Sequence, residues 1–288
     1  MEQTRPTLAT PRADTPGRPR SLGMAALSLH AGLLYLFLYA PIIVLVLFSF
    51  TEDTFGTRLQ GFTLRWYEAL LRDERLISAA INTLTVATLS TIFSTIFGTL
   101  LAMGLERYRF RGRNGVDALV YLPVVVPEVV MALALLVFFA FTYGLINDVL
   151  GIPARLGLIS VTIAHIAFTI SFVVIVVRAS LKGFDRRIEE AASDLGANEW
   201  QTFRHITMPL ILPGVIGGAL LAFTLSLDDF IISFFTTGPG FSLLPVEVYG
   251  QVKRAITPKI NAISTLMLLL SIGLVVLSQF VQRRGEQR

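Results

Sequence analysis

Three acidic residues lie inside long apolar segments of this sequence, namely Glu128, Asp228 and Asp229. On insertion scales, an ionised carboxylate at the centre of a membrane-spanning helix costs about 2.5–3.5 kcal/mol, so such residues are candidates for a substrate or ion site. The aromatic residues that follow the aspartates are Phe230, Phe234, Phe235 and Tyr249. Fixed anions beside aromatic rings suit an organic cation, through ion pairing and cation–π contact. We therefore predict a substrate path that contains Glu128, Asp228, Asp229 and Tyr249.

Each of these residues also has a structural interpretation. Glu128 lies between two prolines and could cap a broken helix or bond a neighbouring subunit. The two aspartates diverge by about 100° on a helix, and they could pair with Lys253 or Arg254 instead of facing one cavity. The phenylalanines could face lipid or pack inside the protein. For His165, we expect a hydrogen-bonded contact between helices rather than a proton relay.

The sequence lacks the residues that most enzymatic sites require. It has no cysteine, and its three histidines are far apart, so we expect no catalytic residue, metal site or cofactor in this chain. The dipeptide Gly-Lys does not occur, which excludes a phosphate-binding loop of the Gly-x-x-x-x-Gly-Lys-Ser/Thr type. If ATP drives a process in which this protein takes part, a separate chain must hydrolyse it.

The composition indicates an integral membrane protein. Of the 288 residues, 53% are hydrophobic and 15% are charged, whereas a soluble domain usually has about 25% charged residues. Each of six apolar segments has the roughly 20 residues that cross a bilayer as a helix. The predicted spans are 27–50, 80–104, 117–141, 159–179, 209–236 and 260–281.

The distribution of basic residues predicts the orientation of these spans. Sixteen of the 24 lysines and arginines lie on one side of the predicted bundle, and that side is cytoplasmic by the positive-inside rule. Both termini are then cytoplasmic. Residues 1–22 are predicted to be a disordered tail, and residues 23–288 to be the membrane domain. Because orientation explains the net charge of +4, we expect contact with membrane lipid and no nucleic-acid partner.

The predicted cytoplasmic loop 182–208 carries its own helix signals. Asp185 can cap a helix over about 186–195, and Gly196 is the residue type that ends one. Asn198 and Gln201 resemble a capping box for a second short helix, and Pro209 would begin the next span. We therefore expect two short helices across the cytoplasmic face, which either dock a partner or lie on lipid as an amphipathic element.

Part of this loop resembles the EAA motif of ABC importer permeases. Glu190-Ala191-Ala192, Gly196, Ile206 and Pro209 match its spacing, with Met208 where leucine is usual. The resemblance extends over about residues 80–285. It implies an all-α, type I ABC importer permease fold with six transmembrane helices, in which the loop docks on an ATPase. The implied ATPase-coupling residues are Glu189, Glu190, Ala191, Ala192, Gly196, Trp200, Phe203, Ile206 and Pro209.

Residues 225–239, 244–250 and 256–262 resemble the polyamine branch of these permeases, whose relatives also handle opines and ferric iron. The resemblance implies alternating access in a bacterial inner membrane. The implied partners are two ABC ATPase subunits, a second homologous permease, and a periplasmic or lipid-anchored substrate-binding protein. The permease pair could be a heterodimer or a homodimer. A proton-coupled secondary transporter would also explain intramembrane acids, but it would not need the EAA-like loop.

Overall fold

The computed structural model describes residues 22–56, 58–183, 185, 187–254 and 257–286. The predicted tail over 1–22 therefore lies almost wholly outside the described residues. Over these ranges the secondary structure is helical, apart from an isolated β-bridge between Gly238 and Phe241. The described residues divide into two units, 22–45 and 46–286. The predicted all-α class is confirmed.

Helix α1 (Leu22–Phe48) makes up the described part of the first unit. Its sequence is apolar on every side, and none of its most apolar 18-residue stretch is buried by the rest of the chain. A helix that is apolar on every side is stable where lipid or protein covers its whole surface. Pro41 lies inside the helix.

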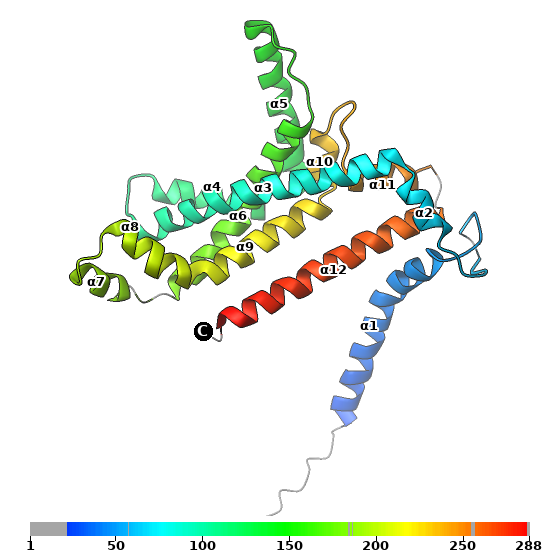
Figure 1. Cartoon of the computed structure of the whole chain (residues 1–288), viewed down its shortest axis with the longest axis horizontal. Helices are drawn as coiled ribbons and strands as arrows, with labels where there is room; N and C mark the ends of the chain where they lie inside the picture. Colours follow the sequence, from blue (N-terminus) through cyan, green and yellow to red (C-terminus); the bar gives the residue numbers. More distant parts are fainter. Residues whose placement is uncertain (1–21, 57, 184, 186, 255–256, 287–288) are drawn as a thin grey trace, which may run out of the picture. The chain divides into compact units, whose positions relative to one another are not determined.

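The second unit is built on three long helices that pack together: α3 (Glu74–Arg107), α6 (Leu158–Lys182) and α9 (Met208–Asp228). Helix α12 (Pro258–Glu286) packs against α9 (Figure 1). Branched and small side chains fill the centre of this bundle, including Ala102, Val173, Val177, Ile211 and Val215. Of the described helices, five are long and apolar enough to cross a membrane, and α12 adds a shorter apolar stretch over Pro258–Gly273.

The three bundle helices approach closely because small residues lie between them. A Cβ atom on Gly98 of α3 would lie 2.8 Å from Cγ1 of Val173 on α6. A Cβ atom on Gly218 of α9 would lie 3.4 Å from the same valine atom. Membrane helices gain most of their association energy from packing, which small residues at the contact make possible. Val173 is thus in contact with both neighbours at the centre of the bundle.

The predicted span over 117–141 is wrong as a single helix. Two helices occupy this region, α4 (Arg113–Val125) and α5 (Glu128–Leu150), and after the break α5 turns away from the bundle (Figure 1). Val126 has an extended backbone, as expected before a proline, and Pro127 has no N–H to continue the ladder. Glu128 is consequently the first residue of α5.

The predicted span over 209–236 is also interrupted. Helix α9 ends at Asp228, Asp229 has an extended ψ of 120°, and a separate helix α10 (Ile231–Thr236) follows. The break contains no proline or glycine, so local sequence gives little warning of it. Both interrupted segments have a predicted substrate-path acid at the interruption.

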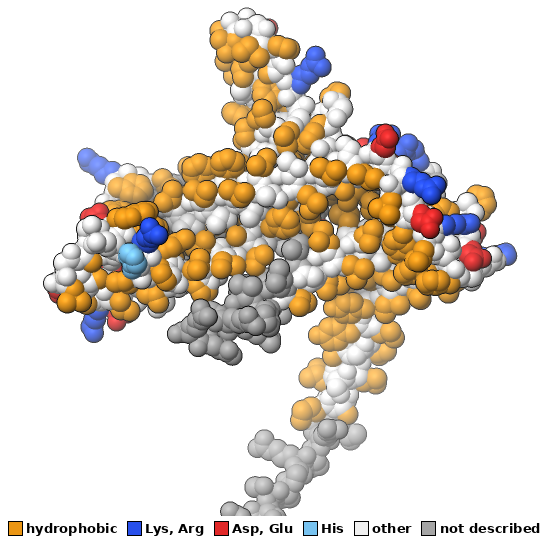
Figure 2. Space-filling view, viewed as in Figure 1, with side chains coloured by type: hydrophobic (Ala, Val, Ile, Leu, Met, Phe, Trp, Pro, Cys, Tyr) orange, Lys and Arg blue, Asp and Glu red, His pale blue; other side chains and the backbone are white. Residues whose placement is uncertain are grey.

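Shorter helices close the end of the unit opposite the 182–208 loop: α2 (Arg65–Leu71) and α11 (Leu244–Val252). Asp73 caps α3 and pairs with Lys259. Burial opposes ionisation of Asp73, but the Lys259 ammonium and the N–H groups of Leu76 and Arg75 outweigh it and lower the pKa of the carboxyl. In Figure 2, charged side chains gather at this end and at the loop end, and apolar ones cover the flank between them.

Candidate functional site

The carboxyl of Asp229 organises the break between α9 and α10. Its Oδ2 accepts hydrogen bonds from Ser233 N at 2.7 Å and Ser233 Oγ at 2.8 Å, and its Oδ1 accepts from Ile232 N at 3.3 Å. These bonds satisfy N–H groups in the first turn of α10, as an N-cap side chain does. Asp229 is only 7% exposed, so it is a buried structural acid as well as a predicted substrate-path residue.

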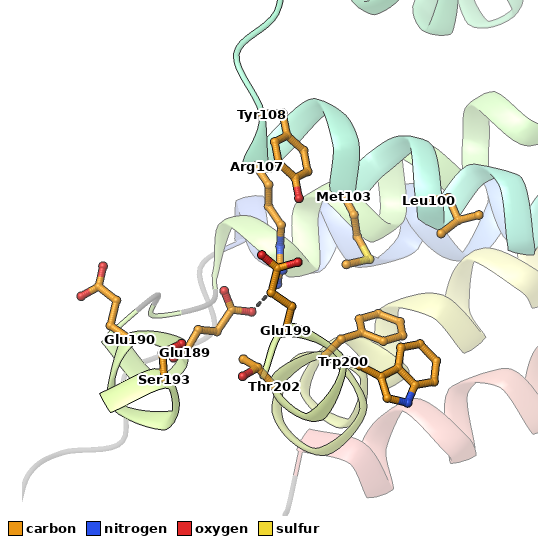
Figure 3. Close-up of a pocket in the computed structure, with 11 residues that line it drawn as sticks. Leu100, Met103, Arg107, Tyr108, Glu189, Glu190, Ser193, Glu199, Trp200 and Thr202 are labelled. Carbon is orange, nitrogen blue, oxygen red and sulfur yellow. Dashed lines mark hydrogen bonds and ion pairs between the residues drawn. The ribbon is translucent and has the colours of Figure 1, made fainter. Parts of the chain in front are cut away.

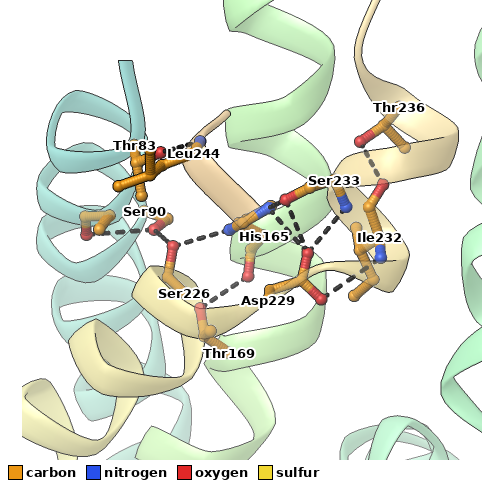
Figure 4. Close-up of polar contacts among 11 residues, drawn as sticks. Thr83, Ser90, His165, Thr169, Ser226, Asp229, Ile232, Ser233, Thr236 and Leu244 are labelled. Carbon is orange, nitrogen blue, oxygen red and sulfur yellow. Dashed lines mark hydrogen bonds and ion pairs between the residues drawn. The ribbon is translucent and has the colours of Figure 1, made fainter. Parts of the chain in front are cut away.

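His165 on α6 connects this break to the bundle (Figure 4). Its Nε2 lies 3.3 Å from Asp229 Oδ2 and 3.1 Å from Ser233 Oγ. Its Nδ1 lies 2.7 Å from Ser226 Oγ on α9, which in turn lies 3.0 Å from Ser90 Oγ on α3. The imidazole is 1% exposed. The predicted hydrogen-bonded contact between helices is confirmed, and it spans four helices.

Glu128 lies beside the same carboxyl. It is the half-buried first residue of α5, and its carboxyl is within hydrogen-bonding reach of the carboxyl of Asp229. Helices α5 and α10 pack together, so the two interruptions meet in space. Discontinuous helices that meet inside a bundle are a common way to build a substrate site in transporters. The sequence predicted both acids but not that they would form a pair.

Asp228 points away from this pair. Its side chain is exposed, and it interacts with Ser271 of α12. The predicted divergence of the two adjacent aspartates is therefore confirmed. The alternative pairing of Asp228 or Asp229 with Lys253 or Arg254 is not found among the described residues. Asp228 interacts with Ser271, and Asp229 pairs with His165. Lys253 Nζ lies 4.7 Å from the ring centroid of Tyr249, and Arg254 Nε donates to the carbonyl of Gly250.

Three aromatic rings form a cluster next to the Asp229 break. The ring of Tyr249 on α11 lies 4.6 Å from that of Phe230 and 6.2 Å from that of Phe234, measured between centroids. Tyr249 and Phe234 are partly exposed, at 37% and 46%. These rings therefore form a partly exposed aromatic surface next to Asp229, which a molecule outside this chain can contact.

The 182–208 loop begins as predicted. Oδ1 of Asp185 accepts from Arg187 N at 3.0 Å, and helix α7 (Arg187–Asp194) follows. Gly196 has a φ of +88°, and Ala197 N donates to Ala192 O at 3.0 Å, so α7 ends in the left-handed turn that glycine favours. Both ends of the first short helix are set by residues that the sequence identified.

The second short helix is only partly as predicted. Asn198 and Gln201 form the expected capping box, with bonds of 2.9 and 2.8 Å, at the start of α8 (Glu199–Thr202). However, α8 continues through a π-helical turn (Phe203–Thr207) directly into α9, and Pro209 does not begin a new helix. The wider turn lies just before Pro209, where the missing N–H interrupts regular α-helical bonding.

The two adjacent glutamates of α7 have different environments (Figure 3). Glu189 is half-buried and pairs with Arg107 at the end of α3, and both side chains also bond the hydroxyl of Thr207. Glu190 is exposed. Glu189 therefore holds α7 to the bundle, and Glu190 is available to a partner. The resemblance to the EAA motif predicts a docking role for both.

A cavity of about 680 Å³ lies between α7, α8 and the end of α3 (Figure 3). Its apolar lining comes from Leu100, Met103, Trp200 and Phe203, and its acidic lining includes Glu190 and Glu199. Trp200 is 64% exposed. This surface includes four of the predicted coupling residues. Of the other five, Ala192 is buried, Ile206 is half-buried, and Ala191, Gly196 and Pro209 are exposed.

Sequence reasoning missed the ion pairs that tie this end together. Arg178 of α6 is 8% exposed and contacts Asp117 of α4 and, at 3.5 Å, Glu106 of α3. In the sequence, Arg178 and Arg107 are recognisable only as two of the sixteen basic residues on the predicted cytoplasmic side. Their partners are distant in sequence, and no local pattern identifies such pairs.

An all-helical membrane bundle with interrupted helices at buried acids, and with short helices at one end, has the architecture of a transport component. The family described as "Binding-protein-dependent transport system inner membrane component" matches residues 94–288. The chain belongs to this family and is a multi-pass inner-membrane permease component.

Two curated relatives cover nearly the whole chain. The spermidine/putrescine transport system permease protein PotC of Escherichia coli K12 is 43% identical over 250 residues, which is 87% of this chain and 91% of PotC. The putrescine transport system permease protein PotI of the same organism is 40% identical over 256 residues, covering 88% and 89%.

Solved structures share the fold. A bacterial ABC transporter involved in the import of the acidic polysaccharide alginate matches with a TM-score of 0.76 and 21% identity, over 92% of this chain and 96% of that one. An amino acid ABC transporter matches with a TM-score of 0.57 and 17% identity, over 77% and 100%. The predicted type I importer permease fold is confirmed.

Proposed function

We propose that this protein is the permease subunit of an ABC importer that moves polyamines, or a closely related organic cation, into the cell. The pairing of Glu128 and Asp229 beside the Tyr249 cluster carries the proposal. Two carboxyls this close are stable together with a shared proton or with a cation between them. A polyamine has several ammonium groups, and the names of PotC and PotI support this substrate class.

The substrate path then contains Glu128 and Asp229 at the helix interruptions, with Tyr249 providing a cation–π surface and Asp228 a second anion. The exposed carboxyl of Asp228 lies one residue from the pair and faces α12. A polyamine with separated ammonium groups could contact both carboxyl positions in succession. The chain itself needs no cofactor in this scheme.

Coupling to ATP is proposed to run through one continuous helix. Glu190 and Ala191 of α7 are exposed and would dock on an ATPase subunit. The Arg107–Glu189–Thr207 bonds tie α7 to the start of the helix over Glu199–Asp228, and Asp229 follows its far end. Movement of α7 would therefore be transmitted to Glu128 and Asp229, and it would expose them in turn to the two sides of the membrane.

The complete importer would contain two ATPase subunits, a second permease and a substrate-binding protein on the outer side. Both termini of this chain would be cytoplasmic, as the basic residues indicate. The apolar surface of α1 would contact lipid or the second permease.

Uptake in a bacterial strain that lacks polyamine importers tests the proposal. The chain is expressed with its ATPase, second permease and binding protein, and radiolabelled putrescine and spermidine are measured. We expect uptake that needs ATP and is lost in the Glu128→Gln variant. The proposal is wrong if neither polyamine enters while an opine or ferric iron does. Uptake that stops with the proton gradient while ATP is maintained would instead identify a secondary transporter.

A further inference from the structure

His165 is a buried ionisable residue that the mechanism above does not use. We propose that His165 is a positioning residue, which through Nε2 fixes the Asp229 carboxyl in the α9–α10 break so that it faces Glu128. This inference rests on the proposed cation path and extends it, because it assigns the orientation of one acid to a residue that does not contact substrate.

The hydrogen-bond partners assign the role of each ring nitrogen. Ser233 Oγ donates its hydrogen to Asp229 Oδ2, so it can only accept from His165 Nε2 at 3.1 Å, and the carboxylate 3.3 Å from the same nitrogen also only accepts. Nε2 therefore carries the hydrogen. In the neutral ring, Nδ1 then accepts from the Ser226 hydroxyl, whose oxygen lies within reach of Ser90. Every polar group of the imidazole is satisfied within an almost fully buried site.

The other donors to Asp229 cannot fix its direction relative to the bundle. Ile232 and Ser233 belong to α10, so they would move together with the carboxyl that caps this helix. Apart from Glu128, whose position relative to Asp229 is the point in question, His165 is the partner of this carboxyl that comes from another helix of the described chain, and α6 packs against both α3 and α9. The imidazole therefore holds the cap of α10 to the bundle, and the cap carries the acid.

Replacement of His165 by asparagine or by glutamine tests the roles of the two ring nitrogens separately. An asparagine amide reaches about as far as Nδ1, so His165→Asn keeps a partner for Ser226 and loses the bond to Asp229. A glutamine amide reaches about as far as Nε2, so His165→Gln keeps a donor for Asp229 and Ser233. Ser226→Ala is a matched control, because it removes the Nδ1 partner and its contact with Ser90 but leaves both partners of Nε2 in place.

Uptake kinetics of the complete importer test the proposal. We expect His165→Asn to raise the KM for spermidine about tenfold, the effect of one lost bond to a charged group. Its Vmax and the amount of protein in the membrane stay near those of the wild type. His165→Gln and Ser226→Ala keep the wild-type KM. Equal KM values for the Asn and Gln variants, or a Ser226→Ala effect as large as that of His165→Asn, would refute the positioning role.

A second measurement separates this inference from the substrate proposal. Labelling of Glu128 by a hydrophobic carbodiimide is measured by mass spectrometry in membranes, without substrate or transport. We expect labelling to increase in His165→Asn, because Asp229 no longer covers Glu128, and to stay unchanged in His165→Gln. If polyamine uptake is absent in the wild type but this labelling pattern is found, the substrate proposal fails and the positioning role stands. Unchanged labelling in His165→Asn refutes the positioning role.

Discussion

Adjacent residues of this protein perform separate tasks, and the direction of each side chain decides which. Glu189 turns toward Arg107 and Thr207, and Glu190 turns outward. Asp229 is buried in a cap, and Asp228 reaches toward α12. In both pairs one acid maintains the structure and leaves its neighbour available to another molecule. On α7 a single residue step of about 100° produces this separation, and at Asp229 the extended backbone after the end of α9 produces it.

The outward direction of Glu190 leads to a prediction about assembly. Reversal of its charge in Glu190→Lys should weaken binding of the ATPase subunit more than about tenfold. The new ammonium group would repel any basic group of the ATPase with which the glutamate pairs. Membrane insertion should be unchanged. Copurification of the ATPase with the tagged permease measures this.

Asp194→Lys is the control for that experiment. Asp194 is exposed on the same helix but is not one of the residues that match the EAA motif, so the same charge reversal there should leave most ATPase binding intact. If both variants copurify the ATPase like the wild type, Glu190 has no docking role.

The residues that could be predicted from sequence are those whose partners are near in the chain. Asp185, Gly196 and the Asn198–Gln201 box act within a few residues, and the structure contains all three signals. His165 bonds residues 61 and 68 positions away, and Arg178 bonds one 61 positions away. Only folding brings such partners together, so single-sequence patterns identify the residues but not the pairs.

At the scale of helices, two predicted spans are interrupted in the structure, and the two breaks have different causes. The break at Pro127 has a local signal, since proline removes an N–H. The break at Asp229 depends on the carboxyl replacing backbone acceptors for α10, with His165 holding it. Apolar periodicity continues through both breaks, which is why each region was predicted as one helix.

The close approach of α3 to α6 gives a prediction about stability. Gly98→Ala should destabilise the protein by about 1–3 kcal/mol, because the new methyl group overlaps Val173. Gly104→Ala on the same helix should be neutral or stabilising, since nothing lies within 4 Å of that position. Thermal unfolding in detergent compares the two variants.

A second substitution identifies the cause of the Gly98 effect. Val173→Ala removes the branched group that the added methyl meets, so the Gly98→Ala/Val173→Ala double variant should regain part of the lost stability. Strictly additive losses would show that the two residues do not compete for the same space.

At the scale of the whole molecule, orientation in the bilayer remains a prediction from charge, and the chain offers a direct test. It contains no cysteine, so a single introduced cysteine gives a single label. We expect Arg72→Cys to react with a membrane-impermeant maleimide on intact cells whose outer membrane admits the reagent. Asp194→Cys should react only after the inner membrane is opened. Both positions are exposed. The reverse pattern would contradict the predicted cytoplasmic position of α7.

The continuous helix over Glu199–Asp228 limits where the chain can gain or lose residues. Its 30 residues extend about 45 Å. Insertion of one residue anywhere along it would rotate its far end by about 100° relative to its start, and Asp229 would no longer meet the imidazole. Natural variation in chain length should therefore be absent from this helix and concentrated in connections such as 237–243. The π-helical turn already contains one residue more than a regular α-helical turn, so removal of a single residue there would leave the register beyond it unchanged.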